Sequence, residues 1–266
     1  MKFKIWAVIL TAATMFAACE KDEPSAETVK DEPGNISGLG ETEGDLTGTT
    51  FKWPDGIEPA DKIVGGYSSR NYTRSAVFNK LTAINDLPTL RTRTVQTRAG
   101  EETIQLDTII GSGRYVTIFI PLRNTTSRPA TITFPAGLIA KSVSGLCQNG
   151  VLLKKTSVSV PAGGIYGVLL LMYCGNAHRD PSYSSEEYVF AVVSNSSLIM
   201  DLCNRVANKR INNEEYPVDE YGYADSDQYS SYRNTLQSIL WDLTDYGDAL
   251  SEEQIARIEQ MKNSGS

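Results

Sequence analysis

The sequence predicts a mainly β protein, an immunoglobulin-like antiparallel β-sandwich with a small helical part at its C-terminal end, from three observations. Between residues 101 and 195, about seven short segments rich in Val, Ile, Thr, Tyr and Phe are separated by turn residues. One of them is apolar over five consecutive residues, and beyond residue 195 the apolar residues recur at helical spacing. Short strands with turn chemistry between them are typical of a sandwich. We therefore expect the sandwich over 101–195 and a helical part that packs on it over 196–266.

The strands are expected where β-branched and aromatic residues stand between glycines, prolines and asparagines. The run 168–172 is apolar throughout, which indicates a central strand covered on both faces. The helical part is expected to provide the cover for its second face. The expected strands are 103–110, 115–122, 130–134, 138–143, 151–160, 165–174 and 188–193.

Three helices are expected after the last strand. Ser196 or Ser197 can cap the first, the second begins at about Ser231, and the third begins at Ser251, where Gln254 completes a capping box. Their apolar stripes are Leu198, Ile199, Leu202, Cys203 and Val206, then Tyr232, Leu236, Ile239, Leu240 and Leu243, then Ile255, Ile258 and Met261.

The first 19 residues match a bacterial export signal. Lys2 and Lys4 precede an apolar run of 14 residues, which is too short to span a bilayer as a helix. Small residues stand directly before Cys19, and this order resembles the lipobox of bacterial lipoproteins, whose cysteine is lipidated and becomes the new N-terminus. The acidic residues 20–23 resemble the surface-export tag of Bacteroidetes lipoproteins. The resemblance implies a signal peptide over 1–18, a membrane anchor on Cys19, and exposure on the cell surface from the outer membrane.

Two segments lie between this signal and the sandwich. Residues 19–50 are acidic, rich in Gly, Ser and Thr, and poor in large apolar side chains, which predicts a disordered tether. The segment 51–100 has weaker patterns, with a brief helix expected over 75–84, and whether it belongs to the sandwich stays open. Its basic residues Arg91, Arg93 and Arg98 are expected in an exposed strand or loop, open to trypsin-like cleavage.

Composition and charge exclude several classes of function. The chain has 25 Lys and Arg against 32 Asp and Glu, a net charge of −7, and no basic stripe, so we expect no nucleic-acid partner. A single histidine removes every multi-histidine metal site. No complete set of nucleophile, base and orienting group is present. We therefore expect a protein that is not an enzyme and that holds no metal and no cofactor.

One pair of segments carries chemistry. Tyr173-Cys174 and, further on, Gln237-x-x-x-Trp241 resemble the thioester domains of bacterial surface adhesins. The resemblance implies an internal thioester between Cys174 and Gln237, an acyl group poised for an amine or hydroxyl of a partner. Such a bond survives only where aromatic and apolar neighbours exclude water, and Tyr173, Tyr232 and Trp241 are the candidates for that shielding.

Residue types alone leave alternatives open. Cys174 also suits a buried strand position, and Gln237 an exposed position on a helix. Because exported proteins meet an oxidising compartment, Cys147, Cys174 and Cys203 allow three disulfide pairings. A bridge between Cys147 and Cys203 leaves Cys174 as the odd thiol that a thioester requires, whereas a bridge at Cys174 excludes the thioester.

The functional expectation is therefore a cell-surface lipoprotein that acts as a binding or adhesion module on a host or cell-surface protein or glycan. One alternative is a structural subunit resembling Bacteroidetes fimbrial lipoproteins, which assemble by strand donation. Another is a glycan-binding accessory lipoprotein of a polysaccharide uptake system, for which the tyrosines of the acidic loop 212–229 offer a contact surface.

Overall fold

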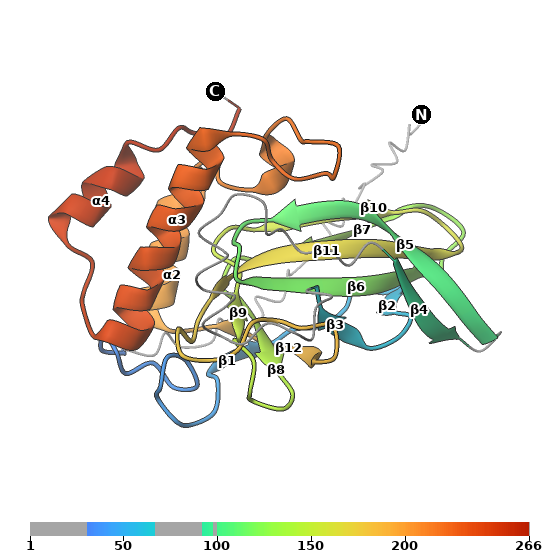
Figure 1. Ribbon diagram of the computed structural model, residues 1–266, viewed down its shortest axis with the longest axis horizontal. Helices are drawn as coiled ribbons and strands as arrows, with labels where there is room; N and C mark the ends of the chain where they lie inside the picture. Colours follow the sequence, from blue (N-terminus) through green and yellow to red (C-terminus); the bar gives the residue numbers. More distant parts are fainter. Residues whose placement is uncertain (1–30, 67–91, 98–99, 266) are drawn as a thin grey trace, which may run out of the picture.

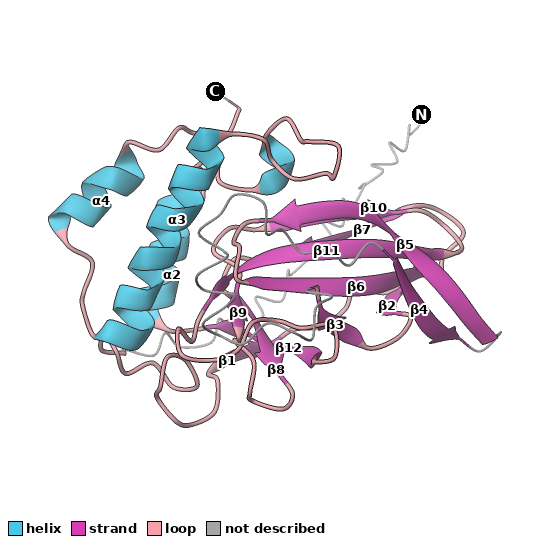
Figure 2. Cartoon of the chain, in the orientation of Figure 1, coloured by secondary structure: helices cyan, strands magenta, loops and turns pink. Residues whose placement is uncertain are grey.

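The computed structural model describes residues 31–66, 92–97 and 100–265, and it gathers three helices at one end of a body of strands (Figure 1). The mainly β prediction is confirmed, and almost all strand pairs are antiparallel (Figure 2). The export signal with Cys19, the acidic residues 20–23, the helix expected over 75–84, and the residues Arg91 and Arg98 lie outside the described residues.

The strands follow one another along the chain in twelve elements. They are β1 (Gly48–Thr50), β2 (Ile57–Pro59), β3 (Ile63–Gly65), β4 (Thr92–Thr97), β5 (Gly100–Gly111), β6 (Val116–Asn124), β7 (Ala130–Phe134), β8 (Leu138–Ser142), β9 (Gly150–Val151), β10 (Thr156–Val160), β11 (Ile165–Cys174) and β12 (Glu187–Ser194). The helices are α2 (Ser197–Val206), α3 (Asp227–Trp241) and α4 (Glu252–Glu259), with a 3₁₀ turn at Asn213–Glu215 and a π turn at Asp242–Tyr246.

Strand pairing closes part of the sheet into a ring. The order β6, β3, β12, β8, β9, β11 returns to its start, because β11 also pairs with β6 from Ile165 to Met172. All pairs within this ring are antiparallel, while β11 pairs with β5 in parallel. β7 and β10 form a separate two-stranded sheet. The predicted sandwich of two distinct sheets is therefore not confirmed, since it requires two open sheets.

The central strand β11 is buried on both faces, as its apolar run predicts. Val168, Leu170 and Met172 contribute to the core inside the ring. Leu169 and Leu171 point to the other side, where they pack with Phe119, Ile109 and Tyr223. The expected cover by helices is realised only further along the strand, at Tyr173, whose ring lies in the core beneath α2, α3 and α4.

Two expected elements differ in their bounds. α3 begins at Asp227 rather than near Ser231, because the side chain of Ser226 accepts a hydrogen bond from Tyr229 N and caps the helix there. The expected strand 151–160 divides into β9 and β10. By contrast, the capping box of Ser251 and Gln254 forms as predicted, and Ser196 caps α2.

The prediction of a disordered tether over 19–50 is wrong from residue 31 onward. Ile36 and Leu39 are buried among the residues of the helical end, and β1 pairs with β12. Two contacts hold this segment to the end of β11 and to the π turn after α3. Gly40 N donates to the O of Gly175, the residue that follows β11, at 2.7 Å, and Gly34 N donates to Leu243 O in the π turn at 2.8 Å. Composition did not predict this packing, because only two large apolar side chains, standing among glycines, are enough to hold the segment 31–50 against the helical end.

The expected uncertainty over 51–100 also has a partial answer. β2 and β3 both pair with β6, so residues 57–65 belong to the sheet. Phe51 and Trp53 pack against Phe134 and Phe190, with ring centroids 5.3 to 6.4 Å apart. Arg93 lies on β4 and donates from Nη1 to Lys62 O at 2.8 Å.

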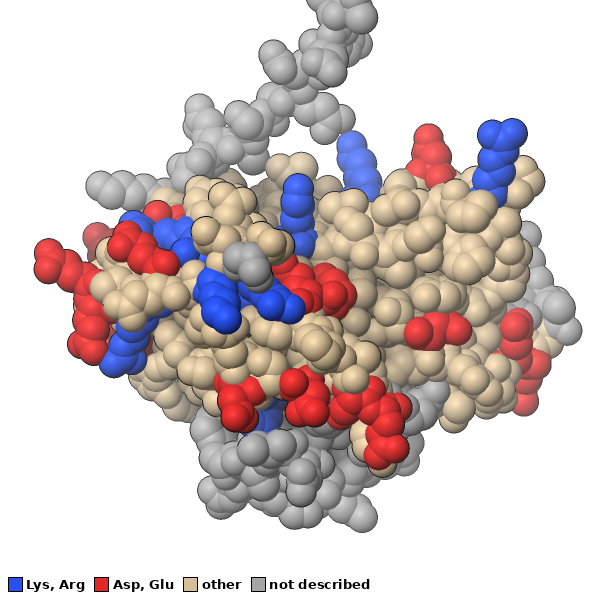
Figure 3. All heavy atoms as spheres, turned by 90° about the horizontal axis from the view of Figure 1, so that it is seen from above, with Lys and Arg blue, Asp and Glu red and all other residues tan. Residues whose placement is uncertain are grey.

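Seen from above Figure 1, the surface has two regions (Figure 3). Basic and acidic side chains are interspersed over the helical end. The strand end is mainly uncharged, because the outward residues of β7 and β10 include Thr131, Thr133, Ser157 and Ser159.

Candidate functional site

The structure brings the two predicted thioester residues together across 63 positions of sequence. Cys174 is the last residue of β11, and Gln237 lies on α3, which stands beside that end of the strand (Figure 1). The carboxamide of Gln237 is hydrogen-bonded at both of its ends to the backbone of Cys174. Oε1 accepts from Cys174 N at 2.8 Å, and Nε2 donates to Cys174 O at 2.9 Å.

Both residues are buried. Cys174 is 0% exposed and Gln237 is 3% exposed. The residue-type alternative is thus correct about the burial of Cys174 and wrong about Gln237, which was expected on the solvent side of its helix. A buried carboxamide must find partners for its donors and its acceptor, and the end of β11 supplies them. Helical periodicity did not reveal this, because the stripe 229, 233, 237, 241 is mostly polar.

The turn after β11 surrounds the sulfur. Asn176 N donates to Cys174 Sγ at 3.4 Å, and the next amide, Ala177 N, donates to Asp245 Oδ1 at 2.9 Å. Burial raises the pKa of the Cys174 thiol to about 12, and a hydrogen bond from the Trp241 indole acts in the opposite direction. Burial also raises the pKa of Asp245 above its ordinary value. The thiol is therefore protonated and held in a water-poor site.

Of the three aromatic residues expected to shield this site, the structure places one there. Trp241 adjoins Cys174, and its ring lies 5.2 Å from that of Tyr115, centroid to centroid. Tyr173 faces the opposite side of β11, because neighbouring strand residues alternate, and its hydroxyl contacts Ser112 Oγ at 2.7 Å. Tyr232 lies elsewhere on α3 and accepts a hydrogen bond from Lys262 N.

Sequence reasoning missed Tyr115 as a neighbour of this site. It immediately precedes β6, and its pKa is raised by burial while the Cys174 thiol acts on it electrostatically. A lone tyrosine before a strand carries no signal of its own. The pairing of β6 with β11 is what brings it to the end of β11.

The bridge considered between Cys147 and Cys203 does not form. Both residues are free and buried, as is Cys174. Cys147 belongs to the core inside the ring, and Cys203 to the core beneath the helices. The separation of these two cores explains why no bridge links them. Cys174 keeps its thiol, as the thioester requires.

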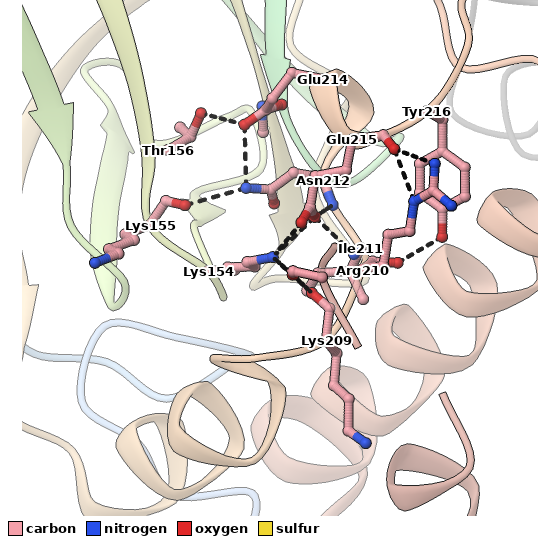
Figure 4. A network of polar contacts seen from close by, with 12 residues as sticks. Lys154, Lys155, Thr156, Lys209, Arg210, Ile211, Asn212, Glu214, Glu215 and Tyr216 are labelled. Atoms are coloured by element: carbon pink, nitrogen blue, oxygen red, sulfur yellow. Dashed lines mark hydrogen bonds and ion pairs between the residues drawn. The ribbon is translucent and has the colours of Figure 1, made fainter. Parts of the chain in front are cut away.

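A second buried polar group is structural in character (Figure 4). Lys154, which lies between β9 and β10, donates from Nζ to both carboxylate oxygens of Glu215, at 2.7 and 2.8 Å. The same nitrogen reaches Lys209 O at 2.6 Å and Ser264 Oγ at 2.7 Å. Every donor of this ammonium is therefore satisfied within the chain, so the network fastens the loop after α2 and the C-terminal residues to the sheet.

A groove lies beside this network, with a volume of about 410 Å³. Tyr221 and Val218, both exposed, stand at its rim, and Glu214 forms part of its lining. Burial raises the pKa of Glu214, whose carboxylate accepts from Thr156 Oγ1 and from Gly111 N. The groove belongs to the acidic, tyrosine-bearing loop that the sequence marks as a contact surface.

Comparisons with protein-family models, with curated proteins and with solved structures found nothing that matches this chain. No helix among the described residues is long and apolar enough to cross a membrane. Over the same part of the chain, no three His, Cys, Asp or Glu side chains gather where they could hold a metal ion.

Proposed function

We propose that this protein is a surface lipoprotein that acts as an adhesion module through an internal thioester between Cys174 and Gln237. One observation carries the proposal: the carboxamide of Gln237 is hydrogen-bonded through both ends to Cys174, and both side chains are buried. The two residues are 63 positions apart in the sequence and share a water-poor site. Their reactive groups, a thiol and a carboxamide, are the two groups that thioester formation needs.

The chemistry is balanced without any oxidant or reductant. The sulfur of Cys174 attacks Cδ of Gln237, the C–S bond forms, and the C–N bond breaks. The thiol proton ends on the departing nitrogen, which leaves as ammonia. Negative charge develops on Oε1 during the attack, and Cys174 N already donates to that oxygen at 2.8 Å. A backbone N–H in this position stabilises the tetrahedral intermediate as an oxyanion-hole donor does.

The lasting bond also needs protection from water. Trp241 and Tyr115 supply aromatic surface next to Cys174, and both are only partly buried, so they stand between the site and solvent. A partner amine or hydroxyl that displaces this cover attacks the acyl carbon, and the partner becomes covalently attached to Gln237.

The test is a mass measurement on the protein purified without reductant. Methylamine opens a thioester, so the treated protein is expected to gain the mass of one methylamine and one new free thiol, located by peptide mapping at Gln237 and Cys174. Cys174→Ala and Gln237→Ala should abolish both changes. Cys203→Ala removes an equally buried thiol and should leave them intact. A wild-type protein that gains neither mass nor thiol refutes the thioester.

The cellular location of the protein is part of the proposal. The lipobox-like residues before Cys19 support lipid attachment, and the acidic residues 20–23 support display on the outer face of the outer membrane. Labelled fatty acid should be incorporated into the wild-type protein and not into Cys19→Ala.

We also propose the more specific fold. The immunoglobulin-like sandwich is supported by Ile132 and Val158, which pack from the two-stranded sheet of β7 and β10 into one core with β6 and β11.

A specific observation favours one alternative, glycan binding. The groove beside Tyr221 joins an exposed aromatic ring to polar side chains, a combination suited to sugars. A glycan array would show binding that Tyr221→Ala removes. A ladder of oligomers in unboiled gels would instead favour the fimbrial alternative.

A further inference from the structure

One stripe of α3 contains more than the thioester glutamine. Tyr229, Arg233, Gln237 and Trp241 recur every four residues, and side chains four apart share one face of a helix. The first three are buried and Trp241 is partly buried. The stripe therefore faces the sheet along its whole length, with a cation one turn before the reactive carboxamide.

Arg233 is buried without an anion. It is 9% exposed, and its guanidinium lies over the ring of Tyr229, 5.2 Å from the centroid. Its Nε is fully buried and has no hydrogen-bond partner among the described residues. It forms no ion pair with any carboxylate in those parts of the chain. A buried charge is costly unless it is paired, so an anionic ligand is the occupant that this position fits.

The guanidinium lies within reach of a ligand bound at the thioester. The Cα atoms of Arg233 and Gln237 are about 6 Å apart along the helix axis, and those of Tyr229 and Gln237 about 12 Å. Because the guanidinium of Arg233 lies over the ring of Tyr229, it is about 6 to 12 Å from Gln237 along the helix axis. Tyr115 connects the two places. Its ring packs on Trp241, and its hydroxyl lies within electrostatic range of Arg114, Arg233 and Cys174.

We propose that Arg233 is an anion subsite of the thioester site, and that the nucleophile this site takes is a primary amine with a carboxylate several bonds away. A partner protein offers that chemistry where a lysine stands beside an acidic residue. The inference rests on the proposed thioester. In the reaction the amine attacks Cδ of Gln237, an amide bond forms, the C–S bond breaks, and a proton from the amine restores the thiol of Cys174.

The test compares two amines that differ only in charge at the far end. ε-Aminocaproate carries a terminal carboxylate, and ε-aminocaproamide carries a neutral amide on the same chain. The rate at which each releases the Cys174 thiol is measured on the wild-type protein, with methylamine as the common reference. We expect the carboxylate to react roughly tenfold faster, because a charge-assisted bond to a guanidinium is among the stronger polar contacts. β-Alanine, whose carboxylate lies closer to its amine, should show less of this advantage.

Two variants test whether Arg233 causes the preference for ε-aminocaproate. In Arg233→Gln the rates with ε-aminocaproate and ε-aminocaproamide, each divided by the methylamine rate of the same variant, should become equal. Arg205→Gln, on the exposed side of α2 where Arg205 pairs with Asp201, should keep the preference. Equal rates for the two amines on the wild-type protein overturn the inference whether or not the variant folds, as does a preference that survives in Arg233→Gln. A wild-type protein that reacts with no amine, methylamine included, overturns the proposed thioester itself, and this result is distinct from the other two.

Discussion

Replacing Gln237 measures how far one side chain holds α3 to the end of β11. The measurement belongs in a Cys174→Ala background, where no thioester can form and only the hydrogen bonds are at stake. In Gln237→Ala the buried N–H and C=O of Cys174 lose their partners on α3, at 2.8 and 2.9 Å. Each buried backbone group left without a partner costs about 1–3 kcal/mol. We expect the free energy of unfolding to fall by about 3 kcal/mol, after a small gain from the helix propensity of alanine.

Urea denaturation followed by tryptophan fluorescence provides this free energy, and an unchanged m value shows that the two-state comparison holds. Gln228→Ala is the matched control, since Gln228 lies on the same helix and its side chain has no hydrogen bond to any of the residues that the structure describes. It should cost less than about 0.5 kcal/mol. Gln237→Leu keeps the volume and removes both hydrogen bonds, so it separates the polar effect from the cavity. If neither Gln237 variant costs more than Gln228→Ala, the paired hydrogen bonds do not join these elements.

Three further predictions follow from the contacts around the site. Gly40→Ala should destabilise the protein by about 2 kcal/mol more than Gly163→Ala. Both glycines have positive φ, but a Cβ at Gly40 would meet a backbone oxygen at 1.9 Å, whereas Gly163 has open space. Equal losses of stability in thermal unfolding would show that the segment 31–50 is not packed at Gly40. Burial raises the pKa of Cys203 to about 12 from an ordinary 9.0. The unfolded chain therefore ionises first, so the contribution of this thiol is present below pH 9 and is lost as the pH rises, by about 1 kcal/mol at pH 10 relative to Cys203→Ala. A difference between the two proteins in urea denaturation that does not change with pH would contradict the burial. Trp241→Ala should form the thioester and lose it to water at least roughly tenfold faster than the wild type. Hydrolysis is visible as a gain of one water in mass over time. A thioester half-life equal to that of the wild type would show that Trp241 does not protect the bond from water.

Local sequence patterns were sufficient for the elements that local physics decides. The β-branched and aromatic composition of β6, β7 and β11 predicted strands, because strand propensity and the turn residues between segments are both short-range properties. Ser251 with Gln254 predicted the start of α4, because a capping box is complete within four residues. The chemical types of Cys174 and Gln237 were visible in the same way.

Long-range contacts decided the rest. The closure of the ring through β6 and β11, and the docking of Ile36 and Leu39 beneath the helices, depend on which surfaces meet, and no short window of sequence contains that information. The sequence alone determined that a thiol and a carboxamide were available in this protein. Only the tertiary structure buried Gln237, aimed it at the backbone of Cys174, put Trp241 beside the sulfur and turned Tyr173 away, because α3 packs across the end of a strand whose neighbouring side chains point to opposite faces.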